Sequence, residues 1–196
     1  VMKIKSTEAR VLAKGVPGYQ DYYPAAVGGI LALKGVAGKV EVEQLFDYEL
    51  KKFLETHITL VYSGISRNSG INNWDVYKDF FDGNESVKKA LSDIADISYE
   101  TYLSIKNKDY KKLLNLIGEE GELRTSLADT IVPAGVKNWC DELKSKELIY
   151  GMKMCGAGGG GCFVLVHNKE AQQKINDLIS ESSFTKLDFD IKGPLL

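Results

Sequence analysis

KMCGAGGGGCF, running from Lys153 to Phe163, places five glycines among the six residues from Gly156 to Gly161. Apolar segments flank the run on both sides, and their length and composition predict strands at Tyr150–Met154 and Cys162–His167. Because strands lie on either side, the run belongs inside the fold and is not a linker. Glycine tolerates positive φ and close approach of other groups, and successive N–H groups in such a loop can converge on an anion. The stretch therefore predicts a strand–loop–strand unit that handles a phosphate group.

Two other phosphate-binding motifs are excluded by their context. The glycines satisfy G-x-G-x-x-G through Gly156, Gly158 and Gly161, but the dinucleotide-binding motif opens a helix, and here a strand follows. Gly38-Lys39 lacks both the glycine five positions before Gly38 and the Ser or Thr after Lys39 that a Walker loop requires. A tight connection between two strands, packed against another element, is the alternative interpretation of the run.

The periodicity of apolar residues predicts further strands and helices on both sides of this unit. Two strands, Gly28–Lys34 and Val40–Phe46, are expected to form a hairpin through Gly35–Gly38. Two glycines, Gly118 and Gly121, are expected to interrupt a central helix. The other expected elements are the end of a helix at Thr7–Lys14, a strand at His57–Ser63, helices at Val87–Asn107, Lys108–Leu127, Pro133–Lys146 and Glu170–Ser182, and a strand at Phe184–Ile191. This order predicts an α+β fold.

Composition excludes several classes of protein. Among 196 residues, 44% are hydrophobic and 27% charged, and the net charge of −2 with interspersed signs argues against a nucleic-acid partner. No apolar run approaches the length of a membrane span, and the first residues do not resemble a signal peptide. Three cysteines without a C-x-x-C pair argue against a disulfide framework or a zinc site. We expect a cytoplasmic protein with free thiols.

A second segment supplies a candidate reactive group. Gly18-Tyr19-Gln20-Asp21-Tyr22-Tyr23-Pro24 places a carboxylate between a flexible turn and an apolar stretch that ends in Gly28-Gly29. Asp21 could accept the proton of a substrate hydroxyl. The alternative is that Asp21 caps a helix, with the tyrosines in the core.

These two segments, in this order, resemble the GHMP kinases, the superfamily of galactokinase, homoserine kinase, mevalonate kinase and phosphomevalonate kinase. KMCGAGGGGC (Lys153–Cys162) resembles the third motif of that family, and Gly18–Gly29 resembles the segment that carries its active-site aspartate. The stretches Val61–Ser69 and Leu123–Leu127 are similar to the branch that phosphorylates sugars or heptose 7-phosphates. The resemblance implies a ferredoxin-like C-terminal domain, an antiparallel sheet covered by helices, at residues 51–196, preceded at residues 1–50 by the end of the N-terminal kinase domain.

The resemblance also implies roles for individual residues and two cofactors, ATP and Mg²⁺. Asp21 corresponds to the catalytic base or the group that orients the attacking hydroxyl. Arg67, which could bind a substrate phosphate with two parallel hydrogen bonds, is equally consistent with an exposed loop. Glu8 is the candidate magnesium ligand, with an exposed helix face as its alternative. Arg124 is expected at a helix surface. The expected nucleotide- or phosphate-binding residues are Gly156, Ala157, Gly158, Gly159 and Gly160, and Tyr22, Tyr23 and Arg67 are the expected substrate-binding residues.

The sequence lacks two motifs of the family, and this changes the function that we expect. The first motif of the family and its P-x-x-x-G-L-G-S-S nucleotide loop do not occur in the 196 residues, which open on Val1. We therefore expect a C-terminal portion of a kinase that phosphorylates a sugar or sugar phosphate, inactive as a fragment because the nucleotide loop holds the phosphates. The alternatives are a non-catalytic ligand-binding domain and a dimerisation module, and a homodimer is left open.

Overall fold

The computed structural model describes residues 19–20, 22–66 and 69–195, and of residues 69–73 it describes the backbone alone. The chain divides into two compact units, one of Val1–Lys52 with Asp190–Leu196 and the other of Phe53–Phe189. The expected domains, residues 1–50 and 51–196, stay a prediction, because the division into units does not say which kinase domain each unit belongs to.

The unit Phe53–Phe189 contains a four-stranded sheet whose order is β4-β5-β3-β6. Every neighbouring pair is antiparallel. Helices fill the crossover from β3 to β4, and a further helix, α8 (Gln172–Ser180), joins β5 to β6. This βαββαβ sequence with its antiparallel sheet is the ferredoxin-like arrangement, so the α+β prediction is confirmed. The strands are β3 (Ile58–Tyr62), β4 (Gly151–Met154), β5 (Cys162–Val166) and β6 (Thr185–Leu187).

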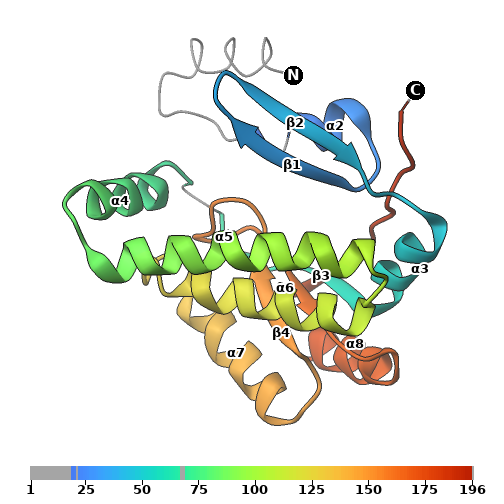
Figure 1. Cartoon of the computed structure of the whole chain (residues 1–196). Helices are drawn as coiled ribbons and strands as arrows, with labels where there is room; N and C mark the ends of the chain where they lie inside the picture. The colour runs from blue at the N-terminus through green and yellow to red at the C-terminus, as the bar shows by residue number, and fades with distance from the viewer. Residues whose placement is uncertain (1–18, 21, 67–68, 196) are drawn as a thin grey trace. The chain divides into compact units, whose positions relative to one another are not determined.

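Four helices lie between β3 and β4: α4 (Ser69–Phe81), α5 (Glu85–Lys106), α6 (Tyr110–Thr125) and α7 (Ala134–Ser145). Polar side chains mark where two of them begin. Asn84 accepts hydrogen bonds from the first amides of α5, and Asp109 does the same for Lys112 at the start of α6, at 3.1 Å. Pro133 precedes α7, as expected. The long helices α5 and α6 run side by side (Figure 1).

One core joins the sheet to α7 and α8. Phe163 and Leu165, two residues apart on β5, point to the same face and are fully buried. Val136 of α7 and Ile175 of α8 belong to the same cluster, and both are also fully buried. Burying each such side chain stabilises the fold by about 1.5–3 kcal/mol. This core holds β4 and β5, and hence the connection between them, in place.

The other unit contains α2 (Tyr22–Val27), a hairpin of β1 (Leu31–Val36) and β2 (Lys39–Gln44), and the start of α3 (Tyr48–His57). The hairpin is confirmed, and it turns at Ala37-Gly38, where Gly38 takes the positive φ of +76° that such turns need. The end of the chain pairs with this unit. The amide of Leu195 donates to the carbonyl of Val27 at 2.6 Å, and Gly28 forms a bridge with Pro194.

Two expectations about helices and strands differ from the structure, and two helices were not expected. Glycines 118 and 121 do not interrupt α6, which runs unbroken from Tyr110 to Thr125. A Cβ on Gly121 would lie 1.9 Å from the carbonyl oxygen of Met152, so glycine is there because the helix crosses β4 at close range. The last strand, expected over Phe184–Ile191, is only Thr185–Leu187, and the helices α3 and α4 were not predicted.

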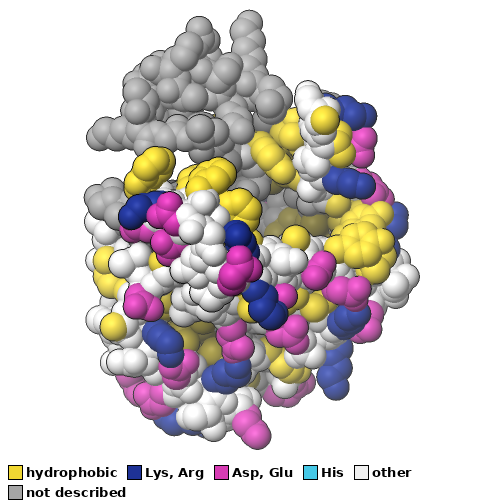
Figure 2. Space-filling view, turned by 60° about the vertical axis from the view of Figure 1, so that its left-hand side comes forward, with side chains coloured by type: hydrophobic (Ala, Val, Ile, Leu, Met, Phe, Trp, Pro, Cys, Tyr) yellow, Lys and Arg dark blue, Asp and Glu magenta, His cyan; other side chains and the backbone are white. Residues whose placement is uncertain are grey.

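The surface fits the sequence-based expectation of interspersed charge. Acidic and basic side chains alternate over the face shown in Figure 2. Among the residues that the structure describes, no helix combines the length and the apolar character needed to cross a bilayer.

Candidate functional site: the glycine loop between β4 and β5

The glycine run forms the connection between β4 and β5, as predicted. The amide of Cys155 donates to the carbonyl of Cys162 at 2.9 Å, which extends the strand pairing to the base of the loop. All five glycines of the loop have positive φ, from +71° at Gly156 to +133° at Gly160. Side chains rarely adopt this backbone region, so the sequence is glycine-rich because the loop geometry requires it.

Half of the loop packs tightly against two neighbouring segments. The amide of Gly159 donates to the carbonyl of Ile131, and the amide of Gly161 to that of Ile65, each at 2.8 Å. A Cβ on Gly158 would lie 2.5 Å from the Ile131 oxygen. The alternative interpretation, a tight connection packed against other elements, therefore describes this part of the loop correctly.

Other amides of the loop are not used in this way. Within the part of the chain that the structure describes, the N–H groups of Ala157, Gly158 and Gly160 have no hydrogen-bond acceptor. Amides of this kind, in a loop with positive φ, are the donors that bind anions in backbone nests. The phosphate-handling interpretation therefore stays a prediction for these three amides.

A cluster of charged side chains lies at the base of the loop, and we call Glu120, Arg124 and Lys153 the loop anchor. Glu120 and Arg124 lie one turn apart on α6 and are joined by an ion pair at 3.3 Å. Lys153 of β4 pairs with the other oxygen of the Glu120 carboxylate. Arg124 also donates from Nη1 to the carbonyl oxygen of Gly156 at 3.0 Å. The anchor thus reaches the first glycine of the loop.

The charged side chains of the loop anchor are partly buried, so the ion pairs between them are costly to break. The Glu120 side chain is 11% exposed, that of Arg124 26% and that of Lys153 32%. Burial lowers the pKa of Lys153, whereas the Glu120 carboxylate beside it acts to raise that pKa. Two cations therefore share one carboxylate in a partly dehydrated place, and removing the carboxylate would leave them facing each other.

Sequence reasoning missed the loop anchor. Arg124 was expected at a helix surface, but it is half-buried and bound to the loop, so that expectation is wrong. The sequence predicts only a place in the glycine motif for Lys153 and no role for Glu120. The signal available was the i, i+4 spacing of Glu120 and Arg124 on one helix face, which does not show that β4 and its loop lie against that face.

Several predicted site residues cannot be placed at the loop. Asp21, Glu8 and Arg67 lie outside the described residues, so their roles stay predictions. Tyr22 and Tyr23 begin α2 in the other unit, where both are half-buried. The ring of Tyr23 packs edge-on against that of Tyr19, with 6.4 Å between ring centres. Among the described residues, no group of three His, Cys, Asp or Glu side chains is arranged to hold a metal ion.

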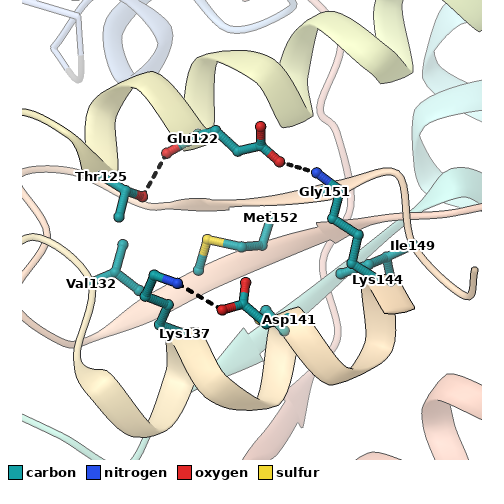
Figure 3. A pocket seen from close by; sticks show the side chains of 11 residues that line it. Glu122, Thr125, Val132, Lys137, Asp141, Lys144, Ile149, Gly151 and Met152 are labelled. Atoms are coloured by element: carbon teal, nitrogen blue, oxygen red, sulfur yellow. Dashed lines mark hydrogen bonds and ion pairs between the residues drawn. The ribbon is translucent and has the colours of Figure 1, made fainter. Parts of the chain in front are cut away.

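A pocket of about 270 Å³ opens elsewhere in the unit Phe53–Phe189, between α6, α7 and β4 (Figure 3). The apolar part of the pocket wall comes from Val132, Ile149 and Met152. Two ion pairs border the pocket, Lys137–Asp141 and Lys144–Glu122. None of the loop glycines lines this pocket, so it is separate from the loop.

Residues 101–181 match the family model described as GHMP kinases C terminal. The match includes α6, α7, β4, the glycine loop, β5 and α8, so the candidate site lies within it. No curated protein matches the chain in sequence.

Solved structures of kinases share the fold. The chain superposes on the L. major mevalonate kinase in complex with R-mevalonate with a TM-score of 0.70 at 16% identity, covering 91% of this chain and 54% of that one. For a protein from Campylobacter jejuni assigned as a sugar kinase, the TM-score is 0.67 at 17% identity. The match covers 95% of this chain and 52% of that one. For a D-glycero-D-manno-heptose 1-phosphate kinase from Bacteroides thetaiotaomicron, the TM-score is 0.60 at 16% identity. The match covers 94% of this chain and 50% of that one. The chain thus spans about half the length of the structures it matches.

Proposed function

We propose, from the match of residues 101–181 to the GHMP kinase C-terminal model, that the chain is part of a kinase that transfers a phosphoryl group from ATP to a hydroxyl of a sugar or sugar phosphate. The unit Phe53–Phe189 would be its C-terminal domain, and the unit that contains Asp21 would be the end of its N-terminal domain.

The observation that carries the proposal is the glycine loop itself. It lies inside the matched segment and is held by the loop anchor. The amides of Ala157, Gly158 and Gly160 have no acceptor among the described residues, and of these three residues Ala157 is partly exposed whereas Gly158 and Gly160 are buried. Phosphoryl transfer depends mostly on positioning and on neutralising charge on the phosphoryl oxygens. Backbone amides without an acceptor can position phosphate oxygens, and this supports ATP as the proposed phosphoryl donor.

The acceptor class rests on two kinds of support. The sugar-kinase branch is resembled by Gln20-Asp21-Tyr22, Val61–Ser69 and Leu123–Leu127. The similar structures include kinases named for a sugar and for a heptose phosphate. In the proposed reaction Asp21 accepts the proton of the acceptor hydroxyl or orients that hydroxyl. Tyr22, Tyr23 and Arg67 are proposed to contact the acceptor.

The proposal includes Mg²⁺ with Glu8 as its ligand, and the ion would neutralise phosphate charge when bound. A location in the cytoplasm and a homodimer are further proposals. The expectation that the 196 residues alone are inactive stays a prediction, and the assay described next tests it when it is run on these residues by themselves.

An ADP-release assay on the longest natural polypeptide that carries this sequence tests the function. A panel of hexoses, heptoses and their monophosphates serves as acceptors, and Asp21→Asn is compared with Asp188→Asn, which changes an exposed aspartate. We expect acceptor-dependent ADP release that Asp21→Asn lowers by about 10²-fold or more, the scale of general acid–base catalysis. The Asp188→Asn variant should keep the activity.

Two results would count against the proposal. Equal turnover of the Asp21→Asn variant would remove that residue from the reaction. ADP release with no acceptor on the panel, combined with phosphate binding, would favour a non-catalytic ligand-binding domain instead.

A further inference from the structure

The loop anchor is more elaborate than a tight turn requires. The loop already has backbone hydrogen bonds to Ile131 and Ile65 that hold its second half. The first half, at Gly156 and Ala157, is held by a guanidinium that itself has a buried carboxylate and a lysine behind it. Placing three charged groups in a partly dehydrated site costs desolvation free energy. We therefore expect the arrangement to do more than hold a turn.

The contact with Arg124 fixes the direction of one peptide unit. Every described peptide bond is trans, and in a trans peptide the C=O and the following N–H point in opposite directions. Because the Gly156 carbonyl is bonded to Arg124, the N–H of Ala157 is directed away from Arg124. That N–H is one of the amides without an acceptor among the described residues.

The charge on Arg124 also changes the strength of that amide. A hydrogen bond from a charged donor is stronger than a neutral one, and it polarises the peptide that accepts it. A polarised peptide donates more strongly through its N–H. The loop anchor therefore both orients the Ala157 amide and makes it a better donor to an oxyanion.

The flexibility of glycine explains why an anchor is needed. The Gly156–Ala157 peptide turns about the Cα–C bond of Gly156 and the N–Cα bond of Ala157, and glycine, which has no Cβ, restricts the first of these rotations less than other residues do. Without a partner for its carbonyl, the peptide between Gly156 and Ala157 is free to rotate. Glu120 restricts Arg124 in turn, since it binds both Nε and Nη2 and leaves Nη1 aimed at the loop.

We infer that Arg124, held in place by Glu120 and Lys153, is a positioning residue that orients the Gly156–Ala157 peptide so that the Ala157 amide binds a phosphate oxygen. This inference rests on the proposed function for the identity of its ligand, a phosphate group of a nucleotide or of a sugar phosphate. The orientation of the peptide itself does not depend on that function.

The test combines NMR of the loop with phosphate titration of the 196-residue chain. Amide resonances of the chain are compared in Arg124→Met, Arg124→Lys and the control Glu122→Gln, which alters a more exposed ion pair on the same helix, with side chains 50% and 59% exposed. Inorganic pyrophosphate is the titrant, and ATP and glucose 6-phosphate are titrated separately to distinguish the two sources of phosphate.

In the Arg124→Met variant we expect the Ala157 amide resonance to move and pyrophosphate affinity to fall roughly tenfold or more, the scale of one charge-assisted hydrogen bond. The urea midpoint of unfolding should change little. Arg124→Lys keeps the charge but has no planar fork to bind Glu120 and Gly156 together, so its affinity should lie between those of the wild type and Arg124→Met. Glu122→Gln should match the wild type.

Two outcomes would overturn the inference. One is an unchanged Ala157 resonance with unchanged pyrophosphate affinity in Arg124→Met. The other is a shift of resonances throughout the unit together with a lower urea midpoint, which would make Arg124 a general structural residue. If the wild type binds none of the three titrants, the proposed function loses its phosphate site, while the Ala157 resonance still decides whether Arg124 orients the peptide. If Arg124→Met does not fold, the comparison is made with Arg124→Lys.

Discussion

Gly121→Ala offers the sharpest check on how α6 lies against β4. On helix propensity alone, alanine in place of a helical glycine stabilises by up to about 1 kcal/mol. In this structure the new Cβ would lie 1.9 Å from the Met152 carbonyl oxygen and 2.9 Å from the carbonyl carbon. Both atoms belong to the backbone of β4, the edge strand of the four-stranded sheet, so no side chain can rotate away to relieve the clash.

The size of the effect follows from the displacement that the clash forces. Carbon–oxygen contacts below 3.0 Å are essentially never observed, so α6 must move away from β4 by about 1 Å, a large shift in a close-packed interior. Overpacking of this kind costs about 1–3 kcal/mol, and backbone atoms on both sides favour the upper end. We expect Gly121→Ala to destabilise the protein by about 2–3 kcal/mol after the gain in propensity.

Gly135→Ala is the matched control. Gly135 also lies in a helix, α7, but a Cβ there would meet nothing within 4 Å. We expect this variant to be as stable as the wild type or more stable by about 0.5 kcal/mol. Urea unfolding followed by tryptophan fluorescence measures both variants, since Trp74 and Trp139 both lie in the unit Phe53–Phe189. With a slope of about 2 kcal/mol per molar urea, Gly121→Ala should lower the midpoint by about 1 M. A midpoint at or above that of Gly135→Ala would refute the close crossing of α6 and β4.

Two further predictions concern Cys140 and Asn84. Burial raises the pKa of the Cys140 thiol from 9.0 to about 12, so between these values the unfolded chain loses a proton that the folded chain keeps, and stability falls as the pH rises. From pH 8 to pH 10 the free energy of unfolding of the wild type should fall by about 1.4 kcal/mol more than that of Cys140→Ala. Urea unfolding at both pH values measures this difference, and equal losses would contradict the burial of the thiol. Asn84→Ala removes the side chain that accepts from Ser86 and Val87 and should lower the free energy of unfolding by about 1 kcal/mol, whereas Asn138→Ala, in the exposed middle of α7, should not.

The parts of the fold that depend on local sequence were predictable. The strands on either side of the glycine run, the hairpin of β1 and β2, and the long helices α5 and α6 all follow from apolar periodicity and turn residues. The strand after Gly161 correctly excluded a dinucleotide-binding fold.

The parts that depend on contacts distant in sequence were not. Gly118 and Gly121 were read as helix breaks because propensity is a local property, whereas their cause is β4, about 30 residues further along the chain. The same holds for the loop anchor: Arg124 and the carbonyl of Gly156 are 32 residues apart, and no periodic pattern pairs them. The helix α3 has a capping aspartate, Asp47, whose carboxylate accepts from the amide of Leu50 at 2.7 Å, a start signal that sequence reasoning overlooked.

The pairing of the chain end with Val27 and Gly28 has a consequence for the order of events during synthesis. Proteins are made from the N-terminus at about 5–20 residues per second, and domains generally fold as units as they emerge. The unit Phe53–Phe189 has all of its residues before Asp190 is added, whereas the unit that begins the chain needs residues 190–195 to complete its contacts. The unit that contains α2 and the hairpin is therefore completed only after residues 190–195 have been made, later than the unit Phe53–Phe189, although α2 and the hairpin precede that unit in the sequence.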